Sequence, residues 1–157
     1  MMKDTSDHLG ERGNGEFTMR RITLLVLFVG ALILAACSAS VLKLEVGTCF
    51  DDPETFEQVE DVPVVDCDEP HDNEVIGNQD LTGDGYPGQE QVENRATQIC
   101  YDKFSEYVGI SYEQSMYDIG WLFPTAETWA AGDREVICFA YDLTLAKITG
   151  SVNGIGQ

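Results

Sequence analysis

The sequence predicts an α+β fold: a small, mainly antiparallel sheet with one principal helix packed on it and disulfides that staple the two together. Three observations predict it. Residues 89–108 carry apolar side chains at three- and four-residue spacing, the period of a helix. Residues 135–142 alternate between two sets of side chains, the period of a strand. Four cysteines follow a segment with the character of an export signal, which is typical of disulfide-bonded domains.

The first strands come from short segments before the helix, with turn-forming residues between them. The segment VPVVDC is rich in β-branched side chains, which favour a strand. Pro70 and Asp72 favour a turn, because proline fixes its φ angle and aspartate can bond the backbone beyond it. The expected strands are residues 46–50, 62–67 and 73–77, and a loop rich in Gly and Pro follows at 83–88.

The principal helix is expected from Gln89 to Val108, and Gly109 ends it. Its apolar stripe consists of Val92, Ala96, Ile99, Cys100, Phe104, Tyr107 and Val108. The remaining positions are mainly polar and face water. Because Cys100 lies on the stripe, its sulfur points at the element on which the helix packs.

A short helix and two strands are expected after the principal helix. Thr125 is a suitable N-cap for the short helix, and Gly132 ends it. Residues 135–142 form a strand with Val136, Cys138 and Ala140 on one face and Ile137, Phe139 and Tyr141 on the other. Residues 147–154, KITGSVNG, are expected to close the sheet as a final strand.

The N-terminal region has the order of a secretory signal. Arg20 and Arg21 precede the apolar run 22–34, and small residues lead to Cys37, which resembles a bacterial lipobox and predicts lipidation at Cys37. An uncleaved membrane helix is the alternative, since the apolar run can extend far enough to span a bilayer. Either anchor places the following residues outside the cell, at the membrane.

The chain therefore divides into four parts. Residues 1–18 are a disordered cytoplasmic segment, or an untranslated one if translation starts at Met19. Residues 19–37 are the signal or anchor, and residues 38–46 a tether. Residues 47–154 suffice for one extracytoplasmic domain and not two.

Acidic residues dominate the exported part. The chain has 28 acidic and 9 basic residues, and four of each lie in residues 1–37, so the net charge of −19 belongs to the rest. Such a surface is repelled by nucleic acid and suits cations and basic partners. It also keeps an exported protein soluble, which is the simpler interpretation.

The cysteines are expected to be chemically idle. Four cysteines allow three connectivities, which the sequence does not decide. We expect the sequence neighbours to pair, as Cys49–Cys67 and Cys100–Cys138, because the second pair would join the helix stripe to the strand face. Cys37 is left for the lipid.

The segment CDEPHDNEV, residues 67–75, invites a metal or catalytic interpretation. His71 stands there among Asp66, Asp68, Glu69, Asp72 and Glu74. A disulfide at Cys67 removes the thiolate, and one histidine cannot build a structural zinc site. A Ser-His-Asp triad would need His71, yet the chain has no G-x-S-x-G signal. We therefore expect no catalytic residue, metal or cofactor, and a local role for His71 in the turn.

Residues 80–91 imitate a calcium loop in part. Asp80, Asp84 and Gly85 fit positions 1, 5 and 6 of such a loop. Gln91 replaces the bidentate glutamate at position 12, which removes two ligand oxygens. A plain loop is the expectation.

These segments together resemble the septum-formation domain family of actinobacterial envelope proteins, from about Gly47 to Ser151. Thr48 departs from the aspartate expected in its first motif. The most specific motif residues are Cys67, Glu69, Pro70, His71, Glu74, Val75, Pro124, Thr125, Trp129, Gly132, Asp133, Arg134, Val136 and Cys138. The resemblance implies a membrane-anchored or exported protein without enzymatic activity or an established ligand. Its motif residues are interpreted as architectural. Arg134 is expected to pair with an acid, and the alternatives are a buried, hydrogen-bonded guanidinium or a solvated one.

The expected function is that of a membrane-anchored, extracytoplasmic, non-enzymatic interaction module of the cell envelope, linked to septum formation and cell division. The expected contacts are the membrane, through lipid or a single helix, and an envelope protein, but no nucleic acid. The alternative is an envelope hydrolase or a ligand- or cation-binding protein that uses His71 and the neighbouring carboxylates.

Overall fold

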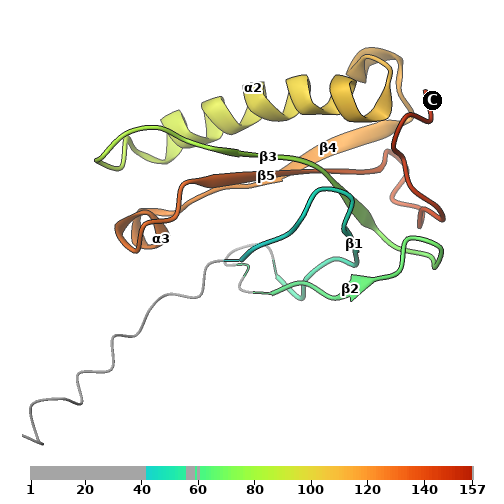
Figure 1. Cartoon of the computed structure of the whole chain (residues 1–157), viewed down its shortest axis with the longest axis horizontal. Coiled ribbons are helices and arrows are strands. Elements are labelled where there is room, and N and C mark those ends of the chain that lie inside the picture. The colour runs from blue at the N-terminus through green and yellow to red at the C-terminus, as the bar shows by residue number, and fades with distance from the viewer. Residues whose placement is uncertain (1–41, 56–58, 60, 157) are drawn as a thin grey trace, which may run out of the picture. The chain divides into compact units, whose positions relative to one another are not determined.

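A computed structural model describes residues 42–55, 59 and 61–156 of the 157-residue chain (Figure 1). Within them lies a five-stranded sheet whose neighbouring strands are all antiparallel, in the order β2-β1-β3-β5-β4. The strands are β1 (Cys49–Phe50), β2 (Val64–Val65), β3 (Asn73–Asp80), β4 (Tyr117–Leu122) and β5 (Glu135–Asp142). The predicted α+β class is confirmed.

Several N-terminal predictions lie outside the described residues. They are the segment 1–18, the signal or anchor at 19–37 and lipidation at Cys37. Of the predicted tether, residues 42–46 are described.

One face of the sheet is covered by α2, Gln89–Val108 (Figure 1). Its buried positions recur at every fourth residue: Val92, Ala96, Cys100, Phe104 and Val108. That spacing places them on one stripe facing the sheet. The helix ends as predicted at Gly109, whose φ of 83° is the left-handed conformation that glycine adopts without steric cost.

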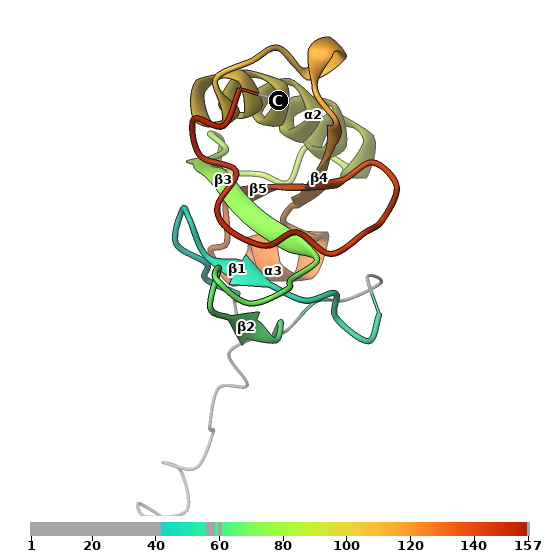
Figure 2. The same ribbon diagram turned by 90° about the vertical axis from the view of Figure 1, so that its right-hand side faces the viewer.

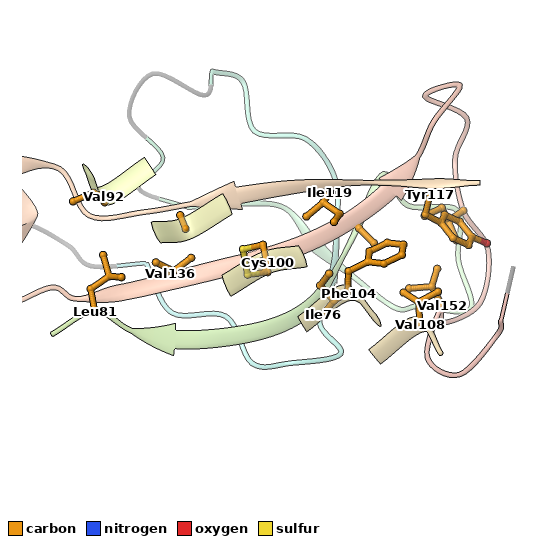
Figure 3. Packing of buried hydrophobic residues seen from close by; sticks show 14 of the residues in the cluster. Ile76, Leu81, Val92, Cys100, Phe104, Val108, Tyr117, Ile119, Val136 and Val152 are labelled. Carbon is orange, nitrogen blue, oxygen red and sulfur yellow. A yellow bond between two sulfur atoms is a disulfide. The ribbon is translucent and has the colours of Figure 1, made fainter. Parts of the chain in front are cut away.

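The main core fills the space between α2 and the sheet (Figure 3). Ile76 of β3, Ile119 of β4 and Val136 of β5 meet the helix stripe there. The Cys100–Cys138 disulfide lies inside this core and joins α2 to β5, as predicted.

A second core lies on the face of the sheet away from α2. It is formed by Leu44, Phe50, Val62, Val75, Ile137 and Phe139. The segment that carries β1 and β2 lies on this side in Figure 2. The predicted Cys49–Cys67 disulfide closes that segment. Ile137 and Phe139 belong to this core and Val136 and Cys138 to the other, so the two faces of β5 follow the predicted alternation.

The short helix α3, Ala126–Ala130, begins at its predicted N-cap. The Thr125 side chain accepts a hydrogen bond from the Thr128 backbone, and the Thr128 side chain accepts one from the Thr125 backbone. This reciprocal capping box satisfies two backbone donors at the helix start. Gly132, with φ 99°, lets the chain turn from α3 into β5.

Two elements differ from expectation. The edge strand β4 and a 3₁₀ turn, η1 (Tyr112–Gln114), were not predicted. On β4, the backbone N–H groups of Tyr117 and Ile119 donate to side-chain oxygens of Ser115 and Asp118, at 3.0 and 2.8 Å.

The final strand predicted at residues 147–154 is wrong. Its ladder contact is a single bridge between Ile148 and His71. The backbone further on instead donates to a side chain: Val152 N–H bonds the Glu74 carboxylate. The segment therefore closes the domain without adding a strand.

Candidate functional site

The turn from Cys67 to Val75 places His71 in the interior. His71 has no exposed surface, and its backbone N–H and C=O both pair with Ile148, at 2.9 and 2.8 Å. Its Nδ1 lies 2.8 Å from the carbonyl oxygen of Glu69. Because a carbonyl oxygen can only accept, Nδ1 donates this hydrogen bond. The other ring nitrogen, Nε2, is buried and has no hydrogen-bond partner among the described residues.

Glu74, three residues on, is a carboxylate with 0% exposure. It accepts hydrogen bonds from Val152 N–H at 2.7 Å, from Ser151 Oγ at 2.6 Å and from Tyr107 Oη at 2.7 Å. Burial, together with the hydrogen bond to Glu74, raises the pKa of Tyr107. One side chain of β3 thus binds the end of α2 and the C-terminal segment.

A group with metal-ligand chemistry is formed by Cys49, His71 and Glu74. One ligand atom from each lies within 4.8 Å of the others, and all three residues are buried. The sulfur of Cys49, however, is bonded to Cys67 and offers no thiolate. In the oxidised protein the group is therefore short of the ligands that a zinc site needs.

The second group of motif residues, Pro124 to Cys138, includes Arg134, for which an acidic partner was expected. That expectation is wrong, because its partners are carbonyl oxygens. Nη1 donates to Trp129 O at 2.8 Å and to Asp133 O at 2.6 Å, and Nε donates to Gly83 O at 3.3 Å. The guanidinium also lies 3.9 Å from the centre of the Trp129 ring, a cation–π arrangement.

These contacts also fix the loop that imitates a calcium site. Trp129 Nε1 donates to Asp84 O at 3.4 Å, and the Tyr86 ring packs edge-on against Trp129. Arg134 Nε also donates a hydrogen bond to the carbonyl oxygen of Gly83 in this loop. The loop is thus held by α3 and the start of β5.

The other motif residues lie in the turns that these contacts hold. Glu69 and Pro70 are exposed beside His71, and Pro124 is buried before α3. Asp133 Oδ1 accepts from the backbone N–H of Glu135, at 3.1 Å. Together they shape the chain around both motifs.

A surface groove lies on the sheet face away from α2, and sequence reasoning missed it. Its volume is about 340 Å³. Phe139, Tyr141 and Gly120 form its floor, and Asp52, Asp72 and Asp142 stand at its rim. We call it the far-face groove. A Cβ at Gly120 would lie 2.2 Å from the Phe139 ring, so that ring rests on glycine backbone.

Hydrogen bonds hold two of the rim carboxylates, Asp72 and Asp142, in their ionised form. For Asp72, burial works to raise the pKa, but hydrogen bonds from Asp52 N–H and Lys147 outweigh it and lower the pKa. Hydrogen bonds from the Thr144 side chain and backbone lower the pKa of Asp142. Both side chains are therefore negative at neutral pH.

One signal for the groove was present in the sequence. The alternation of residues 135–142 placed Phe139 and Tyr141 on a common face. The rim could not be predicted from the sequence, because Asp52, Asp72 and Asp142 come from three separate segments.

The chain was compared with known protein families. A family model described as septum formation matches residues 34–138. The chain belongs to the septum-formation family. No curated protein and no solved structure matches it. In the described part of the chain, no helix is both long and apolar enough to cross a bilayer.

The part that matches the septum-formation family covers both motifs and both disulfides, and it ends within β5. It contains Asp52, Asp72 and Gly120 of the far-face groove. The groove residues Phe139, Tyr141, Asp142, Leu145 and Ala146 follow the matched segment. The groove is therefore built partly from the family segment and partly from the chain after it.

Proposed function

We propose that the chain is a membrane-anchored, extracytoplasmic, non-enzymatic interaction module of the actinobacterial cell envelope that acts in septum formation. Membership of the septum-formation family supports the link to the septum. Arg20, Arg21 and the apolar run before Cys37 support a lipoprotein signal or a membrane helix. Two disulfides support an oxidising compartment outside the cytoplasm.

The observation that carries the proposal is that the side chains best suited to catalysis, His71 and Glu74, are buried. His71 and Glu74 have no exposed surface, and their hydrogen bonds hold the turn and the C-terminal segment. At the surface, the far-face groove offers aromatic and carboxylate groups to a partner. This distribution favours contact over chemistry.

Proximity labelling tests the proposal. The full chain, fused to a labelling enzyme on its extracytoplasmic side, is expected to label division and wall-building proteins at the septum in dividing cells. The control fusion carries residues 1–46 followed by an unrelated exported domain. Labels spread evenly over the envelope, as with the control, would contradict a septal role.

A second candidate is an envelope hydrolase or cation-binding protein that uses His71. Two observations favour it: the buried Nε2 of His71 has no partner among the described residues, and His71 and Glu74 offer ligand atoms within 4.8 Å of each other. His71→Gln, measured beside the exposed control Glu69→Gln, separates the two functions. Loss of a hydrolytic activity, or of calorimetric calcium binding, in a folded His71 variant alone would support the second candidate.

A further inference from the structure

The far-face groove combines aromatic rings with carboxylates, the two kinds of group that bind an organic cation in proteins. We propose that it binds a lysine or arginine side chain presented by a partner protein of the cell envelope. This inference rests on the proposed function and names the kind of partner that it requires.

The floor consists of two rings held in place. The Phe139 ring packs edge-on against Phe50, with ring centres 5.5 Å apart, and the Tyr141 ring centre is 6.3 Å from that of Phe139. The Tyr141 hydroxyl donates to Asp118 Oδ2 at 3.1 Å. A cation within about 6 Å of such a ring face is attracted by its quadrupole. Phe139 is only 6% exposed, so the half-buried Tyr141 ring, oriented by Asp118, offers the larger surface to a cation.

Negative charge exceeds positive charge at the rim. The charged groups that line the groove are Asp52, Asp72 and Asp142, and Lys147 lies beside it, paired with Asp72. Lys147 Nζ pairs with Asp51 at 2.5 Å and with Asp72 at 3.0 Å. Asp52 and Asp142 accept hydrogen bonds from the neutral side chains of an asparagine and a threonine, which orient them without cancelling their charge. A second cation therefore finds two oriented carboxylates.

An apolar lip borders the groove. Leu145 is 79% exposed and has a φ of 61°, and it is the one non-glycine residue with positive φ in the described segments. Its backbone N–H donates to Asp142 O at 2.8 Å, which holds the turn against the rim. A large exposed leucine suits contact with the aliphatic stem of lysine or arginine and with apolar residues beside it.

Charge and size argue for this occupant over others. The net charge of −19 attracts basic proteins and repels nucleic acid. A divalent cation prefers several converging oxygens, whereas the groove floor is aromatic and Asp72 is already paired. A volume of about 340 Å³ suits one long side chain. The exposed leucine beside it favours a protein segment over a free amine.

The test uses capped pentapeptides as probes. The full chain in nonionic detergent micelles, labelled with ¹⁵N, is titrated with Ac-Gly-Leu-Arg-Leu-Gly-NH₂ and with the same peptide carrying citrulline or norleucine for arginine. Shifts of the groove amides give dissociation constants. Arginine is expected to bind about tenfold more tightly than its neutral isostere citrulline.

Two charge-matched double variants complete the experiment. Asp52→Asn with Asp142→Asn is expected to weaken binding of the arginine peptide about tenfold. Glu93→Gln with Asp102→Asn removes the same charge from exposed positions on α2 and is expected to leave binding unchanged. Equal binding of arginine and citrulline, no shift of the groove amides, or equal weakening by both double variants would each overturn the proposal.

The two proposals fail separately. Septal labelling by the wild-type chain that persists in the Asp52→Asn, Asp142→Asn variant would overturn the groove as the docking site and leave the septal function standing. If the wild-type chain labels proteins evenly over the whole envelope, the septal function is contradicted, whatever the peptide titrations show.

Discussion

Glu74 is the carboxylate on which several distant parts of the domain depend. Its donors come from α2 and from the C-terminal segment, at Tyr107, Ser151 and Val152. A buried carboxylate with three hydrogen bonds contributes to stability, whereas the same group with missing partners would destabilise the fold. Glu74, a residue of the family motif, thus has an architectural role.

Glu74→Gln is expected to destabilise the domain by roughly 2–3 kcal/mol. Glutamine keeps the shape, but its amide group would place a donor against the donors that now bind the carboxylate. Urea unfolding followed by circular dichroism measures the change. The exposed control Glu93→Gln is expected to stay within about 0.5 kcal/mol of wild type. Equal stability of the two variants would contradict the role given to Glu74.

Gly120 supports the groove floor through the absence of a side chain. Gly120→Ala is expected to cost about 1–3 kcal/mol, because its Cβ would meet Cε2 and Cζ of Phe139 at 2.2 Å. Gly85→Ala is the matched control, since nothing lies within 4 Å of its Cβ position. Thermal or urea unfolding compares the two. A Gly120→Ala protein as stable as the control would show that the ring moves freely.

Asp72 is expected to make part of the stability depend on pH. Its folded-state pKa lies below the ordinary 3.8, so its ionised form contributes stability above that pH and loses it as the pH falls through the folded-state pKa. Asp72→Asn should therefore cost about 1 kcal/mol at pH 7, and this cost should shrink as the pH falls below 3.8 and through the folded-state pKa. Urea unfolding across this pH range measures the change. A pH-independent difference would contradict the lowered pKa of Asp72, which the Asp52 N–H and Lys147 cause.

At the scale of elements, the two disulfides act on different cores. Cys100–Cys138 closes a span of 38 residues and joins α2 to β5, whereas Cys49–Cys67 closes 18 residues on the other face. In the chain-entropy model the longer span gives the larger stabilisation. The main core should therefore suffer more from loss of its disulfide.

Replacing Cys100 and Cys138 together by alanine is expected to cost about 4 kcal/mol, against about 3 kcal/mol for Cys49 and Cys67. Urea unfolding of each double variant, in the absence of reductant, measures the two costs. A larger loss for the Cys49, Cys67 variant would mean that the second core depends on its disulfide beyond chain entropy.

The elements that the sequence predicted well are those with a single clear period. Residues 89–108 have an uninterrupted helical stripe, and residues 135–142 alternate through eight positions. The strand β4 was missed because Gly120 interrupts its alternation, and glycine is a turn signal in sequence alone. Residues 147–154 alternate like a strand, but their backbone donors go to scattered acceptors, among them Cys67 O, Glu74 and Tyr107 O.

The candidate site was less predictable for a physical reason. The sequence shows His71 and Glu74 as polar residues of an acidic turn, yet both are buried. Their burial depends on donors and carbonyls far along the chain, such as Val152 and Ile148. Local patterns carry no information on such long-range partners, and the same holds for the groove rim.

For the whole molecule, repulsion between like charges works against the compact state. The net charge is −19, and Lys147 at the groove rim is shared between two carboxylates. Adding sodium chloride screens the repulsion, since the Debye length falls to about 10 Å at 0.1 M salt. The unfolding free energy is therefore expected to rise with salt, on the order of 1 kcal/mol between low and physiological ionic strength.

Urea is the denaturant for this measurement, because guanidinium is itself a salt. The variant Glu93→Gln, Asp102→Asn serves as the comparison: with two fewer negative charges it should respond less to salt. A fall in stability with salt would mean that the ion pairs outweigh the repulsion.

The outer edge of β4 has a further consequence. An exposed strand edge normally offers free N–H groups that can pair with a strand from another copy and begin a fibre. Here the N–H groups of Tyr117 and Ile119 are occupied by the side chains of Ser115 and Asp118. Two N–H groups of this edge strand are thus unavailable to a strand from another copy, because oxygen atoms of the same chain already occupy them.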